Sequence, residues 1–318
     1  MTRISVAIPA YNAEQYLREA LDSVFAQTLK PHEIILVNDG SSDRTEEIAL
    51  SYGDSIRYIK QDNQGLAGAR NTAIRAATGD WIAFFDADDV MLAEKIERQT
   101  KAIEANPAVV VVYSGFTFLF PDGSTSNSSA FPARELWPAL RYRSPILPST
   151  SIVRRDALLE MDGFRTVPTE DWDLWFRLIR RWGPAGFQDV PESLLLYRQL
   201  DTSLSKKYMN MTRGRIEMLD NLLLDGLSGV SREMWKRKLE AKIFYQVSLA
   251  MRENNDQRYW AFAIESLLRW PLWGKVNTPF RYVVFANMFY RKLRNFQFSR
   301  QYWWPTRQCR TELSDPVS

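Results

Sequence analysis

Cysteine and histidine are almost absent from this sequence. Of its 318 residues one is cysteine, Cys309, and one is histidine, His32. A lone cysteine cannot form an intramolecular disulfide, which fits a reducing compartment and excludes paired-cysteine redox and metal motifs. A lone histidine argues against histidine triads and histidine-rich zinc sites. We interpret His32, which stands just before an apolar run, as a solvated loop residue.

Long hydrophobic runs are also missing. No stretch approaches the roughly 20 apolar residues that a membrane-spanning helix needs, and the longest candidates, 109–120 and 282–289, are too short or too polar. The chain opens with a strand-like run at residues 4–8 and shows no secretory signal. We therefore expect the protein to be made and kept in the cytoplasm.

Charge is nearly balanced overall but unevenly distributed. The net charge is +3, and the 45% hydrophobic and 25% charged residues are ordinary for a folded soluble protein. Residues 1–205 carry 21 basic and 28 acidic residues, whereas residues 206–318 carry 20 and 10. We expect these two parts to meet different partners, or the basic part to meet a surface.

Strand-like and helix-like segments alternate through the first 120 residues. Strands are expected at residues 4–8, 34–37, 56–59, 81–85 and 109–120. Helices are expected at residues 13–28, from Thr45, at 67–77 and at 92–105. This alternation predicts a doubly wound parallel sheet.

The pattern changes after residue 120. Residues 121–149 are rich in proline, serine, glycine and asparagine, and we interpret them as an irregular segment beside a pocket. Short helices are expected at 157–159 and 172–181. Beyond residue 205 the sequence is helical, basic and aromatic to about residue 304.

Polar residues follow the first four predicted strands. They are Pro9-Ala10-Tyr11-Asn12, Asn38-Asp39-Gly40-Ser41-Ser42-Asp43, the segment 62–71, and Asp86-Ala87-Asp88-Asp89. Each alone is an ordinary turn, tight connection or helix cap. Because ligands bind at the carboxyl ends of the strands in such sheets, together they predict one binding site. Its carboxylates would repel one another unless a cation or hydrogen-bond donors lie among them.

Asp86-x-Asp88 carries the sharpest signal of the four. Two carboxylates that leave a buried strand in this spacing can converge on a hard divalent cation, which prefers oxygen ligands. Such a cation keeps open positions for diphosphate oxygens and neutralises the charge of a departing nucleotide.

The four motifs resemble the signature of family 2 glycosyltransferases. They read Ile8-Pro9-Ala10-Tyr11-Asn12, Val37-Asn38-Asp39-Gly40-Ser41-Ser42-Asp43, Gly68-Ala69-Arg70-Asn71 and Phe85-Asp86-Ala87-Asp88-Asp89. The family has the GT-A fold and inverts the anomeric centre. The resemblance implies an α/β, mostly parallel, doubly wound sheet flanked by helices over residues 1–205. Residues 1–120 would bind the nucleotide sugar, 121–205 would supply the acceptor side and the base, and 206–318 would form a helical extension.

The resemblance also implies a role for each motif residue. Pro9, Tyr11 and Asn12 would line the nucleotide pocket, and Asp39 would accept a hydrogen bond from the base, commonly uracil. Gly68 and Arg70 would lie near the diphosphate or the donor sugar. Asp86 would face the ribose or the sugar, and Asp88, with Asp86, would bind Mg²⁺ or Mn²⁺.

The general base is expected later in the chain. Met161-Asp162-Gly163-Phe164 and Thr169-Glu170-Asp171-Trp172-Asp173-Leu174-Trp175 are similar to the family segment that ends in a Glu-Asp pair. The resemblance makes Asp171 the base, because inversion needs a carboxylate opposite the leaving group. Glu170 is the rival candidate and Asp173 the third. Asp171 would also cap a helix starting at Trp172, and a helix N-terminus favours the ionised form.

One position departs from the family pattern. Relatives often carry a histidine two residues after a Tyr-Arg pair, whereas Tyr197-Arg198 is followed there by Leu200. Leucine can neither ligate a metal nor contact phosphate. Arg198, Ser203 or the pair Lys206-Lys207 would bind the pyrophosphate instead.

The carboxy-terminal segment combines tryptophan with arginine. Residues 256–306 contain five tryptophans, and this mixture suits a helix lying in an anionic membrane interface. The alternative is that the aromatic residues pack over the catalytic domain or in a dimer. The excess of basic residues favours the membrane surface. Nucleic-acid binding also suits a basic aromatic surface, but no nucleic-acid motif is present.

Together these observations predict an inverting, metal-dependent transfer of a sugar from a nucleotide-diphosphate donor to an acceptor hydroxyl. UDP is expected, with GDP and dTDP open. The expected setting is surface polysaccharide or lipid-linked glycan synthesis, at the inner face of the cell membrane. The alternative is a catalytically inactive scaffold that binds nucleotide sugars, which the missing histidine favours. A nucleotidyltransferase or a dinucleotide oxidoreductase would need a glycine-rich loop after the first strand, and none is present.

Overall fold

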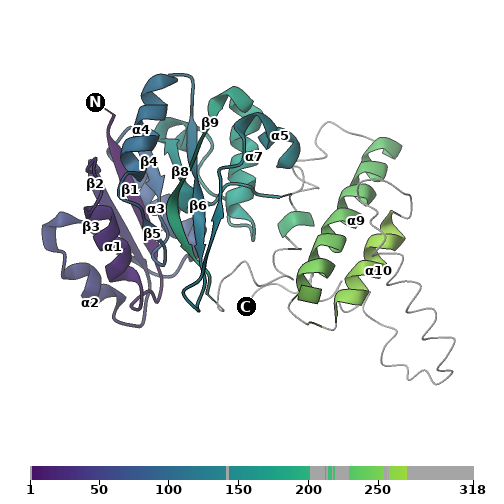
Figure 1. The fold of residues 1–318 in the computed structure, drawn as a ribbon, viewed down its shortest axis with the longest axis horizontal. Helices are drawn as coiled ribbons and strands as arrows, with labels where there is room; N and C mark the ends of the chain where they lie inside the picture. The colour runs from purple at the N-terminus through teal and green to yellow at the C-terminus, as the bar shows by residue number, and fades with distance from the viewer. Residues whose placement is uncertain are drawn as a thin grey trace. The chain divides into compact units, whose positions relative to one another are not determined.

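A computed structural model describes residues 2–140, 143–200, 212, 214–216, 218, 229–253, 256 and 258–270. The chain divides into two compact units, Met1–Thr202 and Ser203–Ser318. The first unit is α/β and the described part of the second is helical (Figure 1). The boundary expected at residue 205 falls among residues outside the described ranges and stays a prediction.

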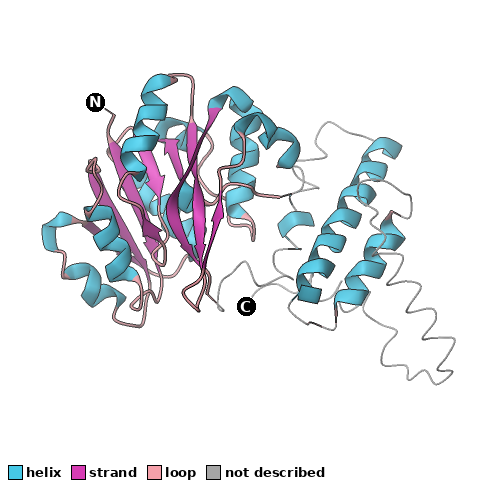
Figure 2. Ribbon diagram, viewed as in Figure 1, coloured by secondary structure: helices cyan, strands magenta, loops and turns pink. Residues whose placement is uncertain are grey.

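The first unit is built on one sheet of nine strands. The strands are β1 (Ile4–Ala10), β2 (Glu33–Asp39), β3 (Arg57–Gln61), β4 (Trp81–Phe84), β5 (Val90–Met91), β6 (Val111–Leu119), β7 (Thr125–Ser128), β8 (Ser151–Arg154) and β9 (Phe187–Arg198). Their order is β3-β2-β1-β4-β8-β6-β9-β5, with β7 beside β6. Figure 2 shows the strands side by side with helices packed around them.

The first four strands form the parallel part that the sequence predicts. β2 pairs with β1 and β3, and β1 pairs with β4, all in parallel. The connecting helices are α1 (Leu17–Phe25), α2 (Thr45–Leu50) and α3 (Gly65–Ala76). Every residue of β1 is buried, as expected for a parallel strand covered on both faces. The predicted doubly wound arrangement is therefore confirmed for this half.

The other half of the sheet is mixed. β8 lies antiparallel between β4 and β6, β9 runs parallel to β6, and β5 and β7 are antiparallel to their neighbours. The predicted strand at 109–120 is confirmed as β6, but no strand was predicted at β5, β8 or β9. β5 and β8 are too short to show a pattern, and Pro191 interrupts β9. The pairing of β9 with β6 shifts around Pro191 and Glu192, where a bulge relieves the missing proline N–H.

The interpretation of 121–149 as irregular was partly wrong. This segment contains β7 and the short helix α5 (Leu136–Ala139). Thr125–Ser128 is polar and exposed, so it has no hydrophobic alternation to mark a strand. It forms because a tight turn at Gly123, with φ of 79°, folds the chain back onto β6.

Three further α-helices belong to the first unit. α4 (Lys95–Ala105) follows β5, and α6 (Arg155–Glu160) and α7 (Glu170–Trp182) follow β8. α7 starts two residues earlier than predicted, which places Glu170 and Asp171 inside its first turn. Gly183, with φ of 68°, ends this helix. Buried Trp175 anchors it by donating from Nε1 to the carbonyl oxygen of Ile146 at 3.1 Å.

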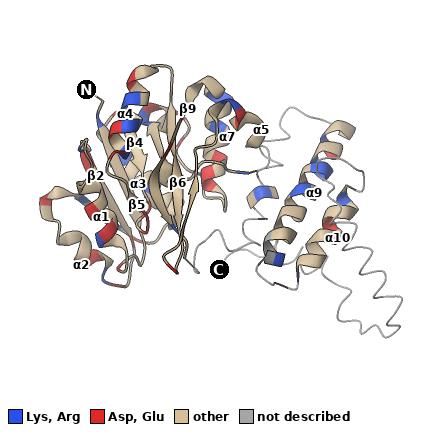
Figure 3. Cartoon of the chain, viewed as in Figure 1, with Lys and Arg blue, Asp and Glu red and all other residues tan. Residues whose placement is uncertain are grey.

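In the second unit, α9 (Gly229–Glu253) packs against α10 (Tyr259–Arg269). The Phe244 and Phe262 rings lie 5.7 Å apart, and Arg269 pairs with Glu240 at 2.9 Å. α9 carries more basic than acidic residues (Figure 3). None of the helices among the described residues is long and apolar enough to cross a membrane. Trp273, Trp303 and Trp304, which carried much of the interface prediction, lie outside the described residues.

Candidate functional site

The loops after β1 and β2 are tied together at the carboxyl edge of the sheet. The Asn12 side-chain oxygen accepts from the backbone N–H of Ser42 at 2.9 Å, and the Asn12 N–H donates to Ser41 Oγ at 3.0 Å. Asn12 adopts the left-handed region, with φ of 48°. Pro9 is buried, while Tyr11 is 55% exposed.

Asp39 is fixed by the next loop of the sheet. Its side chain is 3% exposed, and its Oδ1 accepts from Gln61 Nε2 at 2.6 Å and from the Gln64 N–H at 2.9 Å. These bonds join the end of β2 to the connection between β3 and α3. Asp39 could be identified from the sequence, and Gln64 lies in the polar segment 62–71 noted there, but no sequence signal points to Gln61.

Arg70 joins the segment Asp86–Asp89 after β4, the acidic loop, to the start of α7. Its side chain is buried, with Nη2 2.8 Å from Asp86 Oδ1 and Nη1 3.0 Å from Glu170 Oε1. Both terminal nitrogens therefore contact carboxylates of the protein. Gly68 lies two residues earlier in α3, where an added Cβ would stand 2.5 Å from Gln64 Cβ.

The segment Asp86–Asp89 places three carboxylates close together. Burial, and after it the negative charge of Asp86, raise the pKa of Asp88 to about 6. Asp89 is buried, and its pKa is raised well above the ordinary value by burial and then by the charges of Asp86 and Asp88. Its Oδ2 makes no hydrogen bond. This loop therefore holds more negative charge than its surroundings balance.

The residues present fit a divalent cation only in part. Asp86 and Asp88 offer carboxylate oxygens, and a cation between them would relieve the repulsion that raises the pKa of Asp88. Yet among the residues that the structure describes, no group of three or more acidic, histidine or cysteine side chains could hold a metal ion. Oxygens from a bound diphosphate would have to complete such a site.

Arg198, at the end of β9, also contacts the acidic loop. Its N–H donates to Asp89 Oδ1 at 3.1 Å, and its Nε donates to the carbonyl oxygen of Asp88 at 3.0 Å. Its guanidinium also lies 4.6 Å from the centre of the Tyr16 ring and pairs with Glu19 at 2.6 Å. The sequence identified Arg198 as a candidate site residue but gave no indication of Tyr16 or Glu19. Leu200 is described, whereas Ser203, Lys206 and Lys207 lie outside the described residues.

The predicted base lies in the first turn of α7. Asp171 is partly buried, and its Oδ2 accepts from Ser144 Oγ at 3.1 Å. Burial raises its pKa above the ordinary value. Burial also raises the pKa of Glu170 to about 7, with Arg70 opposing the rise and Asp171 adding to it. The sequence analysis missed Ser144, which stands in the segment interpreted as irregular.

Asp173, the third candidate for the base, is occupied by a structural ion pair. Its Oδ2 lies 2.7 Å from Arg177 Nε, and its Oδ1 lies 3.5 Å from Arg165 Nη1. The side chain is almost fully buried. A carboxylate held in this way is a poor acceptor for a substrate proton, which leaves Asp171 and Glu170.

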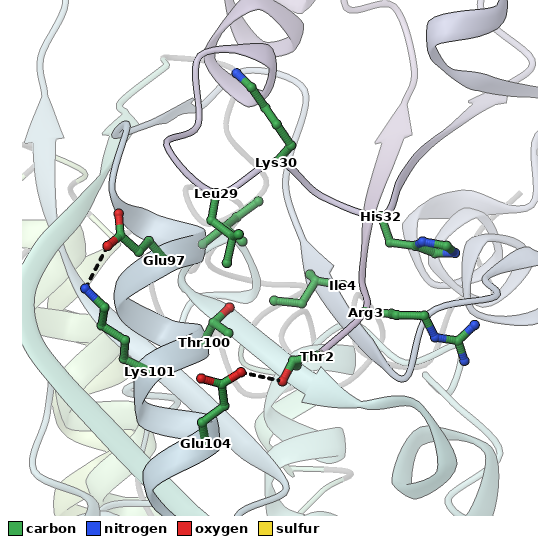
Figure 4. Close-up of a pocket in the computed structure, with 11 residues that line it drawn as sticks. Thr2, Arg3, Ile4, Leu29, Lys30, His32, Glu97, Thr100, Lys101 and Glu104 are labelled. Carbon is green, nitrogen blue, oxygen red and sulfur yellow. Dashed lines mark hydrogen bonds and ion pairs between the residues drawn. The ribbon is translucent and has the colours of Figure 1, made fainter.

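A hollow of about 340 Å³ lies at the opposite, amino-terminal edge of β1 (Figure 4). Ile4, Leu29 and Ile96 provide its apolar wall. The exposed His32 lies on its rim, as expected of a solvated loop residue. None of the predicted site residues lines this hollow, so the candidate site and the hollow are separate features.

Residues 5–161 match the model of Glycosyl transferase family 2. An uncharacterized glycosyltransferase of Rickettsia typhi is 36% identical over 192 residues, which cover 56% of this chain and 58% of the relative. Across the first curated relatives, the chain spans about half of their length.

Two solved structures share the fold. S. aureus TarS (residues 1–349), in complex with UDP-GlcNAc, superposes with a TM-score of 0.56 at 16% identity, covering 94% of this chain and 93% of that one. The mannosyltransferase PcManGT from Pyrobaculum calidifontis, in complex with GDP-Man and Mn²⁺, gives 0.55 at 17%, covering 92% and 80%.

Proposed function

The chain belongs to glycosyl transferase family 2, and from this membership we propose that it moves a sugar from a nucleotide-diphosphate donor to an acceptor hydroxyl. One observation carries the proposal. Arg70 contacts both Asp86, on the side expected to bind the donor, and Glu170, the neighbour of the expected base. The groups proposed to bind a donor and to activate an acceptor thus share one contact residue.

The nucleotide would bind at the ends of β1 and β2. The exposed Tyr11 ring offers a surface for the base, and Asp39 offers a fixed carboxylate for a ring N–H. We propose UDP as the first candidate. GDP stays in the test because PcManGT is in complex with GDP-Man, whereas TarS is in complex with UDP-GlcNAc.

Asp88, together with Asp86, would hold Mg²⁺ or Mn²⁺. A bound cation would neutralise charge that develops on the diphosphate as it leaves. The role of the protein is to hold the carboxylates in place. Arg198 does so from β9 through Asp89 and the Asp88 carbonyl oxygen, and Arg70 does so from α3 through Asp86.

Asp171 is the proposed general base. It would take the proton of the acceptor hydroxyl as that oxygen bonds to C1 of the sugar and the bond from C1 to the phosphate oxygen breaks. Attack from the face opposite the diphosphate inverts the anomeric centre. Asp171 keeps partial solvent access, which a base that meets an acceptor needs, and the N-terminus of α7 favours its ionised form.

We place the reaction in surface polysaccharide or lipid-linked glycan synthesis, with the protein at the inner face of the cell membrane. The basic character of residues 206–318 supports attachment to anionic lipid. Because α10 packs on α9, a truncation should remove only residues 271–318. We expect anionic vesicles to bind the full chain but not the truncated protein. Equal binding of both proteins would show that residues 271–318 are not needed for attachment to the membrane.

Calorimetric titration with UDP, GDP and dTDP, each with and without Mn²⁺, tests the proposal. Metal-dependent binding of one nucleotide supports the donor site and narrows the sugar to those carried on that nucleotide. Binding without turnover of the matching nucleotide sugars would favour the inactive scaffold, for which Leu200 is the argument. A folded protein that binds none of them would contradict both functions.

A further inference from the structure

A brace of four residues links the acidic loop to the start of α7. It consists of Arg70 and Asn71 on α3, Phe164 in the loop after α6, and Glu170 in α7. Asn71 holds Phe164 at two points: its Nδ2 donates to the Phe164 carbonyl oxygen at 2.7 Å, and its Oδ1 accepts from the Phe164 N–H at 2.8 Å. The backbone that leads to Glu170 is therefore fixed to α3.

The Phe164 ring contacts both Arg70 and the end of β4. The guanidinium carbon of Arg70 lies 5.2 Å from its centre, and the ring meets Phe84, at the end of β4, edge-on at 5.0 Å. Gly163 permits this contact, because its φ is 64° and an added Cβ would stand 2.2 Å from Asn71 Oδ1. The ring thus supports the arginine against the strand that leads to Asp86.

Arg70 is the cation at the centre of the brace. It pairs with Asp86 and Glu170, and the charge of Asp171 also acts on it. The groups that act on the Glu170–Asp171 pair come from three elements. They are Arg70 from α3, Asp86 from the loop after β4, and the Ser144 hydroxyl from the segment before β8. Arg70 is the cation among these groups.

We propose that Arg70 is a positioning residue, held by the brace, that favours the ionised form of the Glu170–Asp171 pair and holds the pair at a fixed distance from Asp86. The role of Asp171 as base rests on the proposed function, whereas the charge effect of Arg70 on the pair does not. The arginine fork suits this task because it reaches two carboxylates at once. A lysine ammonium on its flexible stem lacks that planar fork.

The sign of the effect follows from the charges. Burial raises the pKa values of both carboxylates, and Arg70 lowers them. Loss of the arginine charge would therefore raise both values further, by about one unit or more. Near neutral pH more of the pair would be protonated, and a protonated Asp171 cannot accept a proton.

The test is a carboxyl titration by NMR of the full chain, labelled with ¹³C in the side-chain carboxyls of aspartate and glutamate. Spectra of Glu170→Gln and Asp171→Asn variants assign the two signals. We expect Arg70→Gln to raise the midpoints of the pair by about one pH unit or more, and Arg70→Lys to raise them by less. Arg75→Lys, an exposed position on the same helix, is the matched control and should leave them unchanged.

Unchanged midpoints in a folded Arg70→Lys protein and a folded Arg70→Gln protein would overturn the inference. If Arg70→Gln does not fold, Arg70→Lys decides alone, and a midpoint equal to that of Arg75→Lys counts against the proposal. The titration needs no nucleotide or acceptor. Failure of the wild-type protein to bind UDP or GDP with Mn²⁺ would therefore contradict the proposed function separately.

Discussion

The two halves of the first unit contribute to the site in different ways. In the parallel half, Asp39 is the last residue of β2, and Asn12 and Asp86 come two residues after β1 and β4, so the topology of the sheet brings them to one edge. In the mixed half, Glu170 and Asp171 start a helix, and Ser144 reaches Asp171 from a loop. The placement of the site residues in the parallel half thus follows from local sequence, whereas in the mixed half it depends on contacts between segments far apart in the chain.

This comparison predicts that the two halves can be damaged separately. The largest effect is expected for Asp171→Asn. It removes the proposed base and its charge, so transfer should fall by about 10²- to 10⁴-fold, the range of general-base effects, while nucleotide binding stays near wild type. Steady-state rates and calorimetry on the same preparation measure both. An equal loss of rate in Glu170→Gln would leave the choice between the two carboxylates undecided.

Asp88→Ala should damage the parallel half instead. Loss of a residue that only supports a metal ligand typically lowers metal affinity by about 10- to 100-fold. Asp88 is itself a proposed ligand, so we expect metal-dependent nucleotide binding to weaken by more than that. Titration with UDP in the presence and absence of Mn²⁺ measures this. Asp54→Ala, an exposed carboxylate distant in sequence from the acidic loop, is the control. Full activity of the wild-type protein in EDTA would remove the metal from the mechanism.

Gly163→Ala tests the junction between the halves. The alanine would have to adopt a left-handed backbone conformation, and its Cβ would collide with Asn71 Oδ1. We therefore expect the free energy of unfolding to fall by about 2 kcal/mol. Gly123→Ala is the matched control, since Gly123 is also left-handed but has open space around it. Equal losses in denaturant titrations of the two variants would show that the Asn71 contact contributes nothing.

Ser144→Ala should have the smallest effect, confined to the mixed half. It removes one hydrogen bond to Asp171, worth about 1 kcal/mol, or roughly a fivefold loss in kcat/KM. That bond lowers the pKa of Asp171. Its loss should move the acidic limb of the rate profile to higher pH, since the carboxylate would then ionise later. An unmoved limb would contradict the assignment of Asp171 as the group that titrates.

The same difference between the halves explains what could be predicted from sequence. The strands β1, β2, β3 and β4, and the polar residues after them, follow from hydrophobic runs bounded by turn residues. The contacts of Arg70 with Asp86 and Glu170 could not be predicted, because residues 70 and 170 lie 100 positions apart and no local pattern joins them.

Apart from β6, the strands of the mixed half could not be predicted, for physical reasons. β5 has two residues, β9 contains Pro191, and the exposed strand β7 is polar throughout, so none shows the alternation that marks a strand. Of the residues around Asp88, Arg198 was identified through its family motif. Tyr16 and Glu19 were not, because Tyr16, at the N-cap of α1, and Glu19, in its first turn, belong to no sequence motif.

The path of the chain between β4 and β5 has a consequence for folding. These strands follow each other in sequence, yet β8, β6 and β9 separate them in the sheet, a distance of roughly 19 Å in a flat sheet. The connecting segment would span roughly 20 Å if fully extended, and a turn from Asp86 to Asp89 shortens it. The sheet must therefore curl so that β5 can pair with β9 while β4 pairs with β8. The loop that carries the acidic residues thus acts as a tether that sets the curvature of the sheet.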